Sequence, residues 1–335
     1  MASLKDISVA CGVSTATVSK ALNGAPDISE ATRERIFLVS EQMKYRPNAA
    51  ARALKTNRTY NLGVLFKDEA DSGLTHEYFA GVLEGFKNEA ESKGFDITFI
   101  NNNNASISFY DHCKYRNVDG VAIVCADFSN PQVLELAKSN LPIVTFDYIF
   151  NGKMAVLSDN LKGISDLFHY VYDQGHRKIA FIHGAPSSVT EARLVGFYRA
   201  AEEAQIEIPD TYVREGVFHD PASCARITGE LLDLPDPPTC ILFPDDFSAL
   251  GGISEIRQRG LRIPEDISVA GYDGLHLSQV LDPPLTTIHQ KTRTMGRTGA
   301  IQLIELIEHP KTTLARTDCV VGDLWKGSSV APLKK

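Results

Sequence analysis

The stretch DISVACGVSTATVSKALNG, from Asp6 to Gly24, contains two short helical patterns separated by a single glycine. Ser3 followed three residues later by Asp6 is the pattern of a capping box, which begins a helix. Gly12 permits the backbone to turn sharply, and Ser14 can cap a second helix. The stretch therefore predicts two short helices joined by a tight turn.

Apolar residues give each predicted helix one inward face. They are Leu4, Ile7, Ala10 and Cys11 in the first helix and Val18, Ala21 and Leu22 in the second, which Asn23 and Gly24 end. A third helix is predicted from Ser29 to Lys44, with Ile36, Val39 and Met43 facing the first two. Three helices of this size form a small helix-turn-helix domain, which we expect over residues 1–46.

The outward face of the second helix predicts a contact with DNA. Thr15, Ala16 and Ser19 are short side chains, and Lys20 is a long cation. Short side chains let a helix approach base edges and thymine methyl groups in the major groove, while a cation reaches guanine or phosphate. The alternative is an ordinary helical hairpin with a glycine turn.

The segment after the third helix predicts a second contact with DNA. Pro47 ends that helix, and Asn48 can cap the run AAARAL, residues 49–54. A helix of two turns is too short to be stable alone, and Leu54 is its single large hydrophobic residue. Two copies over a minor groove would place Leu54 as a wedge between base steps and Arg52 near the backbone. A solvated linker helix is the alternative.

Charge is divided unevenly along the 335 residues. Residues 1–60 hold nine Lys and Arg against five Asp and Glu, a balance of +4, and the remainder holds 25 against 37, a balance of −12. A basic module on an acidic body suggests a nucleic-acid or membrane contact at one end. The alternative is a merely soluble surface.

Composition argues against several other classes of protein. No apolar run approaches the roughly 18 residues that cross a bilayer, and MASLKDIS lacks the features of a signal peptide, so we expect a cytoplasmic protein. The six cysteines are scattered, and we expect reduced, mostly buried thiols. His169, His176 and His183 are separated by different predicted elements, so we expect no metal site.

No catalytic motif is present. The sequence has no phosphate-binding loop, no nucleophile elbow and no dinucleotide-binding glycine pattern. We therefore expect no enzyme activity, no catalytic residue and no cofactor.

From Tyr60 onward, short β-rich runs alternate with amphipathic helices. After the strand NLGVLF, one helix has its inward stripe at Phe79, Val82, Leu83, Phe86 and Ala90. Further strands are predicted in the runs DITFIN, GVAIVCA, PIVTFD, KIAFIHG, VREGVF, TCILFP and DISVAGYDG. Apolar strands alternating with helices predict parallel sheets covered on both faces. So many units predict two doubly wound sheets, with a seam near residues 159–163.

Ligands of such folds bind beyond the carboxyl ends of the strands, here between two lobes. The residues at those ends are Asp127, Asp147, Tyr148, His183, Phe218, Asp245, Asp246 and Asp273, and Arg193 begins the helix after His183. Aspartates with one arginine bind hydroxyl pairs, and aromatic faces suit a pyranose, so a neutral sugar is the preferred ligand. A strongly anionic ligand would meet several carboxylates and one cation. Asp245 and Asp246 have a second interpretation as caps of the following helix.

Several motifs in order carry a resemblance to a known family. GVSTATVSKALNG, YRPNAAARAL, GVLF, VDGVAIV, GYDG and PLTTIHQ resemble, over essentially the whole chain, the lactose-repressor/galactose-repressor (LacI/GalR) family of bacterial transcription factors. The resemblance implies an α/β protein in which a three-helix helix-turn-helix domain and a hinge helix precede a two-lobed periplasmic-binding-protein-like body of two doubly wound parallel sheets. It also implies three chain crossings between the lobes, the later ones near Gln290 and Val320.

The resemblance implies contact residues as well. By position these are Thr15, Ala16 and Lys20 in the major groove and Asn48, Ala51 and Leu54 at the hinge. To them we add Ser14, Ser19 and Asn23 as expected major-groove contacts and Arg52 as an expected hinge contact. The implied effector contacts are Tyr78, Phe79, Asp147, Tyr148, Arg193, Phe218, Asp246 and Asp273. Since Phe79 fits the inward helical stripe, Tyr78 is the better contact of that pair. Many members have arginine in place of Lys20, which leaves the base read there open.

The implied organisation is a homodimer on a near-palindromic operator. The helix-turn-helix domain would span residues 1–46, the hinge and linker 47–58, and the effector-binding and dimerisation domain 59–335. Within the last, we expect an N-lobe over about 59–161 and 291–320 and a C-lobe over about 162–290 and 321–330. The tail lacks the leucine heptads that would join dimers into tetramers.

These features predict a transcriptional regulator whose operator affinity changes when a sugar binds between the lobes. Repressor is the preferred type. Effector binding would separate the hinges and lower operator affinity, although a co-repressor of opposite sign is physically possible. Two alternatives are a regulator controlled mainly by a protein co-regulator and a sugar-binding protein of a transport system.

Overall fold

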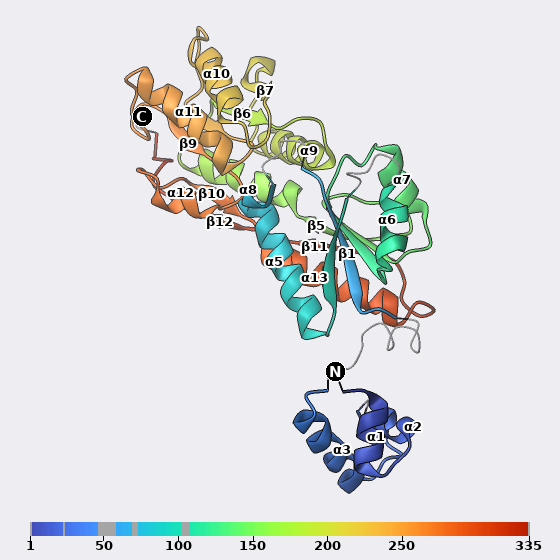
Figure 1. Ribbon diagram of the computed structural model, residues 1–335. Helices are drawn as coiled ribbons and strands as arrows, with labels where there is room; N and C mark the ends of the chain where they lie inside the picture. Colours follow the sequence, from blue (N-terminus) through green and yellow to red (C-terminus); the bar gives the residue numbers. More distant parts are fainter. Residues whose placement is uncertain (1, 23, 46–57, 69–72, 102–106, 334–335) are drawn as a thin grey trace. The chain divides into compact units, whose positions relative to one another are not determined.

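The computed structural model describes residues 2–22, 24–45, 58–68, 73–101 and 107–333. Internal contacts divide the chain into two units, Met1–Thr59 and Tyr60–Lys335, and each is considered separately (Figure 1). The predicted helix at residues 49–54 lies outside the described residues. The mixed α/β fold class predicted from the sequence is confirmed.

The N-terminal unit contains three helices, α1 (Leu4–Cys11), α2 (Thr15–Leu22) and α3 (Glu30–Gln42). The predicted capping box is present: Asp6 N donates to Ser3 Oγ at 3.3 Å, and Ser3 N donates to Asp6 Oδ2 at 2.8 Å. Gly12 ends α1 in the left-handed region at φ 61°, and Ser14 Oγ accepts from Thr17 N at 3.0 Å. The two predicted caps and the glycine turn are therefore confirmed.

The core of this unit consists of the five buried residues Ile7, Cys11, Val18, Ala21 and Ile36. The predicted inward position of Met43 is wrong, because its side chain is 37% exposed. Helix α3 ends at Gln42, and Lys44 follows with φ 50°, so the chain turns away one residue after the cap. Met43 therefore leaves the inward stripe that Ile36 and Val39 follow.

The first sheet of the body has six parallel strands in the order β11-β5-β4-β3-β1-β2. Its strands are β1 (Asn61–Phe66), β2 (Asp96–Ile100), β3 (Gly120–Cys125), β4 (Ile143–Phe146), β5 (Met154–Ser158) and β11 (Thr317–Val320). We call this sheet and its helices the N-lobe. The short 3-10 turn η1 (Gly73–Thr75) precedes its first helix.

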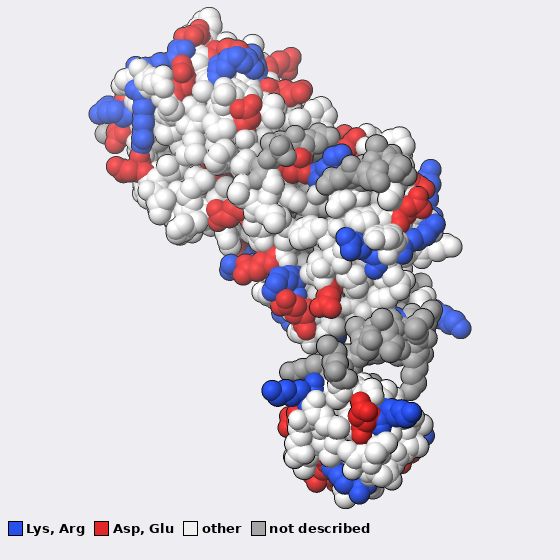
Figure 2. Space-filling view, in the orientation of Figure 1, with Lys and Arg blue, Asp and Glu red and all other residues white. Residues whose placement is uncertain are grey.

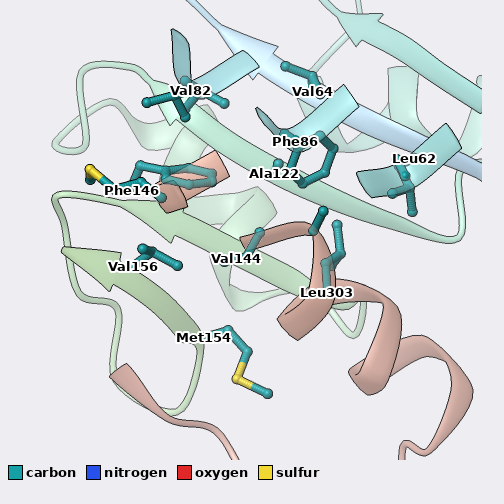
Figure 3. Close-up of a cluster of buried hydrophobic side chains, with 14 of the residues drawn as sticks. Leu62, Val64, Val82, Phe86, Ala122, Val144, Phe146, Met154, Val156 and Leu303 are labelled. Carbon is teal, nitrogen blue, oxygen red and sulfur yellow. The ribbon is translucent and has the colours of Figure 1, made fainter. Parts of the chain in front are cut away.

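Helices cover both faces of the N-lobe sheet. One face carries α5 (Glu77–Ser92) and α13 (Thr292–Glu308), and the other carries α6 (Phe109–Arg116) and α7 (Pro131–Lys138). Figure 3 shows Val82 and Phe86 of α5 and Leu303 of α13 in one apolar cluster with side chains of the strands. The two helices far apart in sequence thus share one core.

The second sheet has four parallel strands in the order β7-β6-β8-β9, and with its helices forms the C-lobe. The strands are β6 (Ile179–His183), β7 (Val213–Glu215), β8 (Cys240–Leu242) and β9 (Ser268–Ala270). Its helices are α8 (Asn160–Asp173), α9 (Ser188–Glu203), α10 (Pro221–Leu232), α11 (Asp246–Gln258) and α12 (His276–Val280), with a 3-10 turn η2 (Asp210–Tyr212). Helices α8 and α9 pack on one face and α10 and α11 on the other.

The chain passes between the lobes three times (Figure 1). It crosses from β5 to α8, from β10 (Thr287–His289) to α13, and from β11 to β12 (Asp323–Trp325). Strands β10 and β12 pair antiparallel at these crossings. The sequence patterns did not predict β5, β10, β11 or β12 as strands.

The six cysteines are free thiols, of which four are buried, Cys125 is partly buried and Cys319 is exposed. Within the described ranges, no helix combines the length and apolar character needed to cross a membrane.

Candidate functional site

The predicted reading face of α2 lies on the surface of the N-terminal unit. Ser14, Thr15, Ala16 and Lys20 are exposed and Ser19 is partly buried, while Val18 and Ala21 hold the helix on the core. Figure 2 shows Lys and Arg side chains at several places on the visible face of this unit, with acidic side chains between them. The helix therefore offers short side chains and one cation to a partner.

Lys20 has a partner within the unit. Its Nζ lies 2.5 Å from Asp27 Oδ2, and both side chains are about half exposed, at 53% and 55%. Exposed ion pairs contribute little, roughly 0–1 kcal/mol. Lys20 can therefore exchange Asp27 for a phosphate or a base at small cost. The remaining predicted DNA contacts, Asn23, Asn48, Ala51, Arg52 and Leu54, lie outside the described residues.

In the N-lobe, Asp147 is held at the end of β4 with its backbone in the left-handed region, φ 51°. Tyr78 of α5 donates its hydroxyl to Asp147 Oδ2, and Ser158 N donates to Oδ1 at 2.7 Å. Loss of water raises the pKa of Asp147, and the hydrogen bonds from Tyr78 and Ser158 oppose that rise. Burial and the neighbouring carboxylate raise the pKa of Tyr78, which keeps it a donor.

In the C-lobe, Arg193 of α9 is 4% exposed. Its Nε donates to Asn160 Oδ1 at 2.8 Å, and its Nη1 donates to the carbonyl of Pro244 at 2.6 Å. Its Nη2 lies 3.9 Å from Asp273 Oδ1, and the guanidinium lies 3.6 Å from the centre of the Tyr272 ring. These contacts fix a charged group that would otherwise be costly to bury.

Asp273 follows β9 and is 9% exposed, with φ 98°. Gln290 Nε2 donates to its Oδ1 at 2.6 Å. Burial raises the pKa of Asp273 to about 7, although the charge of Arg193 acts in the opposite direction. This carboxyl therefore titrates near neutral pH.

The polar groups of the two lobes meet at one place. Ser188 Oγ of α9 donates to the carbonyl oxygen of Asp147 at 2.7 Å. The charge of Arg193 acts on both Tyr78 and Asp147, and its guanidinium lies 5.7 Å from the centre of the Phe218 ring. The structure thus brings together five of the residues predicted for effector binding: Tyr78, Asp147, Arg193, Phe218 and Asp273.

Asp246 lies near Asp273 of this group but is enclosed by other contacts. Asp246 is fully buried, and its oxygens accept from Thr287 Oγ1 at 2.7 Å and Leu275 N at 2.8 Å. Burial raises its pKa well above the usual value, with Asp273 adding to the effect. Asp245 caps α11 and accepts from Ser248 N at 2.7 Å. The interpretation of these aspartates as helix caps is therefore confirmed for Asp245. Asp246 supports the loop that carries Asp273.

The other predicted residues are held by separate contacts, and Tyr148 also lines the pocket described below. Phe79 is partly buried and packs against Phe66 with ring centres 5.3 Å apart, so it belongs with the core. Tyr148 stacks on Phe128 with ring centres 4.1 Å apart. Asp127 is exposed and accepts from Ser129 N at 2.8 Å, and His183 Nδ1 lies 2.8 Å from the carbonyl of Gly184.

A pocket of about 290 Å³ opens beside Asp147 between the lobes. Its lining consists of Asp147, Tyr148, Ile149, Leu157, Ser158, Asn160, Ser188, Val189 and Ala192. A wider depression of about 550 Å³ lies around Arg257 and Arg262 in the C-lobe. Arg262 pairs there with Asp266, and none of the predicted effector residues lines it. The smaller pocket adjoins the candidate site through Asp147 and Tyr148, whereas Tyr78, Arg193, Phe218 and Asp273 do not line it.

The sequence patterns missed the residues that hold the site in place. Asn160 positions Arg193, and Gln290 positions Asp273. Asn160 lies two residues after the end of β5, and the site could have been extended to it had that strand been predicted. Gln290 was recognised as a crossing point between the lobes and not as a contact.

The raised pKa of Asp273 gives a test of this geometry. The folded protein binds this proton with a pKa of about 7, against 3.8 for an unperturbed aspartate, so the folded state holds more protons between those values. The stability contributed by the protonated form is therefore lost as the pH rises from about 4 to about 7. The free energy of unfolding of the wild type relative to Asp273→Asn should fall by up to about 1.4 kcal/mol per pH unit. Urea unfolding at pH 5, 6, 7 and 8 measures this difference.

Asp127→Asn is the matched control, because Asp127 is exposed and also follows a strand. The difference in free energy of unfolding between Asp127→Asn and the wild type should stay constant over the same pH range. Parallel stability curves for Asp273→Asn and the wild type would mean that Asp273 is ionised throughout.

The described geometry combines a small three-helix unit that presents an outward helix with a two-lobed body that gathers polar groups between its sheets. Residues 3–48 match the model described as "Bacterial regulatory proteins, lacI family", and residues 168–330 match a periplasmic binding protein-like domain. The chain belongs to the LacI/GalR family of bacterial transcriptional regulators.

Individual relatives agree over nearly the full length. The chain is 33% identical to the HTH-type transcriptional repressor PurR of Aliivibrio salmonicida over 92% of this chain and 93% of the relative. The lac repressor dimer bound to operator and the anti-inducer ONPF is similar at 26% identity and a TM-score of 0.79, over 98% of this chain and 99% of that one. The transcriptional regulator CelR in complex with cellobiose has 25% identity and a TM-score of 0.73, over 98% and 100%.

Proposed function

We propose that this protein is an operator-binding transcriptional repressor that acts as a homodimer in the cytoplasm. The exposed face of α2, with Thr15, Ala16 and Lys20, supports the assignment of the major-groove contact. The similarity to a repressor dimer solved on its operator supports the partner and the dimeric state. The relatives named above are transcriptional regulators and not enzymes.

The effector in this proposal is a neutral sugar. The observation that carries it is the convergence of Asp147 and Asp273 on a single buried arginine, Arg193, between the lobes. Carboxylates accept from hydroxyl pairs and the guanidinium donates to them, while the Phe218 ring offers an apolar face. A strongly anionic ligand would meet two carboxylates and one cation that is already engaged. The cellobiose complex of a similar regulator supports this class.

The proposed switch links the lobes to the hinge. The lobe limits are those expected from the sequence, 59–161 with 291–320 for the N-lobe and 162–290 with 321–330 for the C-lobe. Effector binding would change the relation of the lobes and separate the two segments at residues 47–58, which lowers operator affinity. The switch requires only that the two states differ in their affinity for the effector. An effector that raises operator affinity, and so acts as a co-repressor, is therefore the opposite outcome of the same test.

Thermal-shift screening of the full-length dimer against neutral sugars and sugar phosphates tests the effector class. A neutral sugar should raise the melting temperature, because a ligand that binds the folded state alone stabilises it by mass action. The same sugar should then release the protein from operator fragments selected from genomic DNA. Stabilisation by phosphorylated compounds alone would reverse the assignment, and no response to any compound would favour control by a protein co-regulator.

Leu54→Ala should weaken binding to operator DNA by at least tenfold and leave binding to random duplex DNA nearly unchanged. A wedge between base steps contributes only where the duplex can be kinked at the target, whereas phosphate contacts act on every sequence. Fluorescence anisotropy at fixed salt measures both affinities. Arg52→Ala is the comparison, since loss of a phosphate contact should weaken both DNAs alike. Equal losses on both DNAs for Leu54→Ala would contradict a hinge wedge.

A further inference from the structure

Two histidine rings form a stacked pair between the lobes. His76, the residue that precedes α5 in the N-lobe, lies over His219 of the C-lobe with ring centres 4.1 Å apart and planes inclined by 23°. His219 stacks in turn on Phe247 of α11 at 4.0 Å and 10°. Phe79 also contacts His76, with ring centres 4.7 Å apart and planes inclined by 56°. Ring contacts therefore join the two lobes here, and Tyr78 of the candidate site lies 6.4 Å from His76 between ring centres.

The surroundings of His76 oppose a positive charge on its ring. Its side chain is 9% exposed, and within the described ranges its Nδ1 has no hydrogen-bond partner. It precedes the first turn of a 16-residue helix, where the helix dipole disfavours a cation. Burial lowers the pKa of His76 to about 4, and His219 adds to this effect, while Asp68 and Asp245 act in the opposite direction.

The carboxylates on the packed elements are engaged elsewhere. Glu77 of α5 accepts from His276 N of α12 at 2.9 Å. Asp245 caps α11 and also accepts from His219 N at 2.9 Å, and Asp220 caps α10. Asp246 and Asp273 are held by the contacts described above. None of these contacts reaches the His76 ring.

We propose that the stack of His76 on His219 is a proton-sensitive latch between the lobes, which holds them together while His76 is neutral and releases them when it is protonated. The latch belongs to the body alone and does not depend on the operator or on the identity of the effector. Its failure would leave the proposed function untouched.

The sign of the effect follows from the two states of His76. Separated lobes return the ring to water, where its pKa is about 6.5, whereas in the stack the pKa is about 4. Closing the lobes below pH 6.5 therefore requires loss of a proton. The equilibrium constant for closure should fall by up to tenfold for each pH unit between 6.5 and 4. Closure should be independent of this group above pH 7.

Small-angle X-ray scattering of the full-length protein, coupled to size exclusion and light scattering, tests the latch. The radius of gyration of the wild-type dimer should be constant from pH 8 to 7 and should increase as the pH falls to 5. His76→Phe keeps a stacking ring that cannot be protonated, so this variant should remain compact at pH 5. His309→Gln, at an exposed histidine after α13, should behave as the wild type.

Light scattering selects particles of dimer mass, and far-ultraviolet circular dichroism at each pH confirms that they are folded. Asp273 also titrates near this range, but it is present in all three proteins, so the difference between wild type and His76→Phe isolates the latch. An unchanged radius for the wild type between pH 7.5 and 5 would overturn the proposal. An equal increase in His76→Phe would overturn it as well.

Discussion

Gly296→Val is expected to lower the free energy of unfolding of the body by at least about 3 kcal/mol, at or above the upper end of the usual cost of overpacking a core. Gly296 lies on α13 where this helix meets α5. A Cβ at this position would lie 1.9 Å from the carbonyl oxygen of Val82 and 2.6 Å from Phe86 N. Both are backbone atoms of α5, which cannot move aside as a flexible side chain would.

The contact is reciprocal, which is why the expected effect is large. A Cβ at Gly85 of α5 would lie 2.1 Å from the carbonyl oxygen of Arg293 on α13. The two helix backbones therefore touch through glycines from both sides. Moving them apart would expose the cluster in Figure 3, to which Val82, Phe86 and Leu303 contribute.

Urea unfolding followed by circular dichroism measures the change, with Thr294→Val as the control. Thr294 lies on α13 and is exposed, so this variant places valine in the same helix without entering the contact. Its stability should stay within about 0.5 kcal/mol of the wild type. If Gly296→Val unfolded at the same urea concentration as the control, the close approach of α5 and α13 would be incorrect.

Arg193→Met is expected to abolish the response to any sugar that stabilises the wild type, with at least a hundredfold loss of affinity. Methionine retains much of the apolar stem but removes every donor. Asn160, the carbonyl of Pro244 and Asp273 would each lose a partner in a buried site. Breaking a buried charge pair in this way costs about 3–5 kcal/mol, which also predicts a less stable C-lobe.

A double variant separates the loss of binding from the loss of stability. Arg193→Met combined with Asp273→Asn leaves no unpaired charge between the two positions, so part of the stability should return while the sugar response stays absent. Arg199→Met is the matched control on α9, because its side chain is 65% exposed and pairs only with Glu203 among the contacts described. Isothermal titration calorimetry with the sugar and urea unfolding measure the two quantities. A normal sugar affinity in Arg193→Met would remove Arg193 from the site.

Local signals in the sequence were sufficient to predict the helix caps and the glycine turn of the N-terminal unit. Ser3 with Asp6, Gly12 and Ser14 are position-specific signals, and each occurs where the sequence predicted it. Met43 was misplaced because the periodicity of α3 continues past the point where the helix ends. A pattern of apolar residues reports which side faces inward but not where the backbone leaves the helix.

The body was predicted in outline for a different reason. Alternation of apolar strands with helices predicts parallel sheets. Strand β5 was missed because it follows a turn in which Asp147 and Gly152 have positive φ, and residues 154–158 show no clear strand pattern. The strands β10 and β12 have three residues each, too few to show any periodicity. They form because segments distant in sequence meet at the crossings, which local patterns do not report.

The sequence predicted part of the membership of the candidate site and not the roles of its residues. Asp245 and Asp246 both follow β8, and the sequence does not show that one caps α11 while the other is enclosed by Thr287 and Leu275. Tyr78 and Phe79 are adjacent on α5, and the inward stripe favoured Phe79 for the core. Tyr78 is the more deeply buried of the two, at 8% exposed, and belongs to the core cluster against which Phe79 packs. Which side chain meets which depends on the distance between lobes, and this is a property of the folded body.

Residues 317–329 complete both lobes. Strand β11 pairs with β5 in the N-lobe sheet, and beyond it Ser329 is fully buried in the C-lobe, where its Oγ accepts from Thr286 N at 2.8 Å and donates to the carbonyl of Val269 at 2.6 Å. During synthesis these segments leave the ribosome after the other strands and helices of both lobes, so the nascent body stays unfinished after the three helices of residues 4–42 have emerged. A nonsense codon before residue 317 would therefore yield a fragment that keeps a DNA-reading helix but has lost its means of regulation.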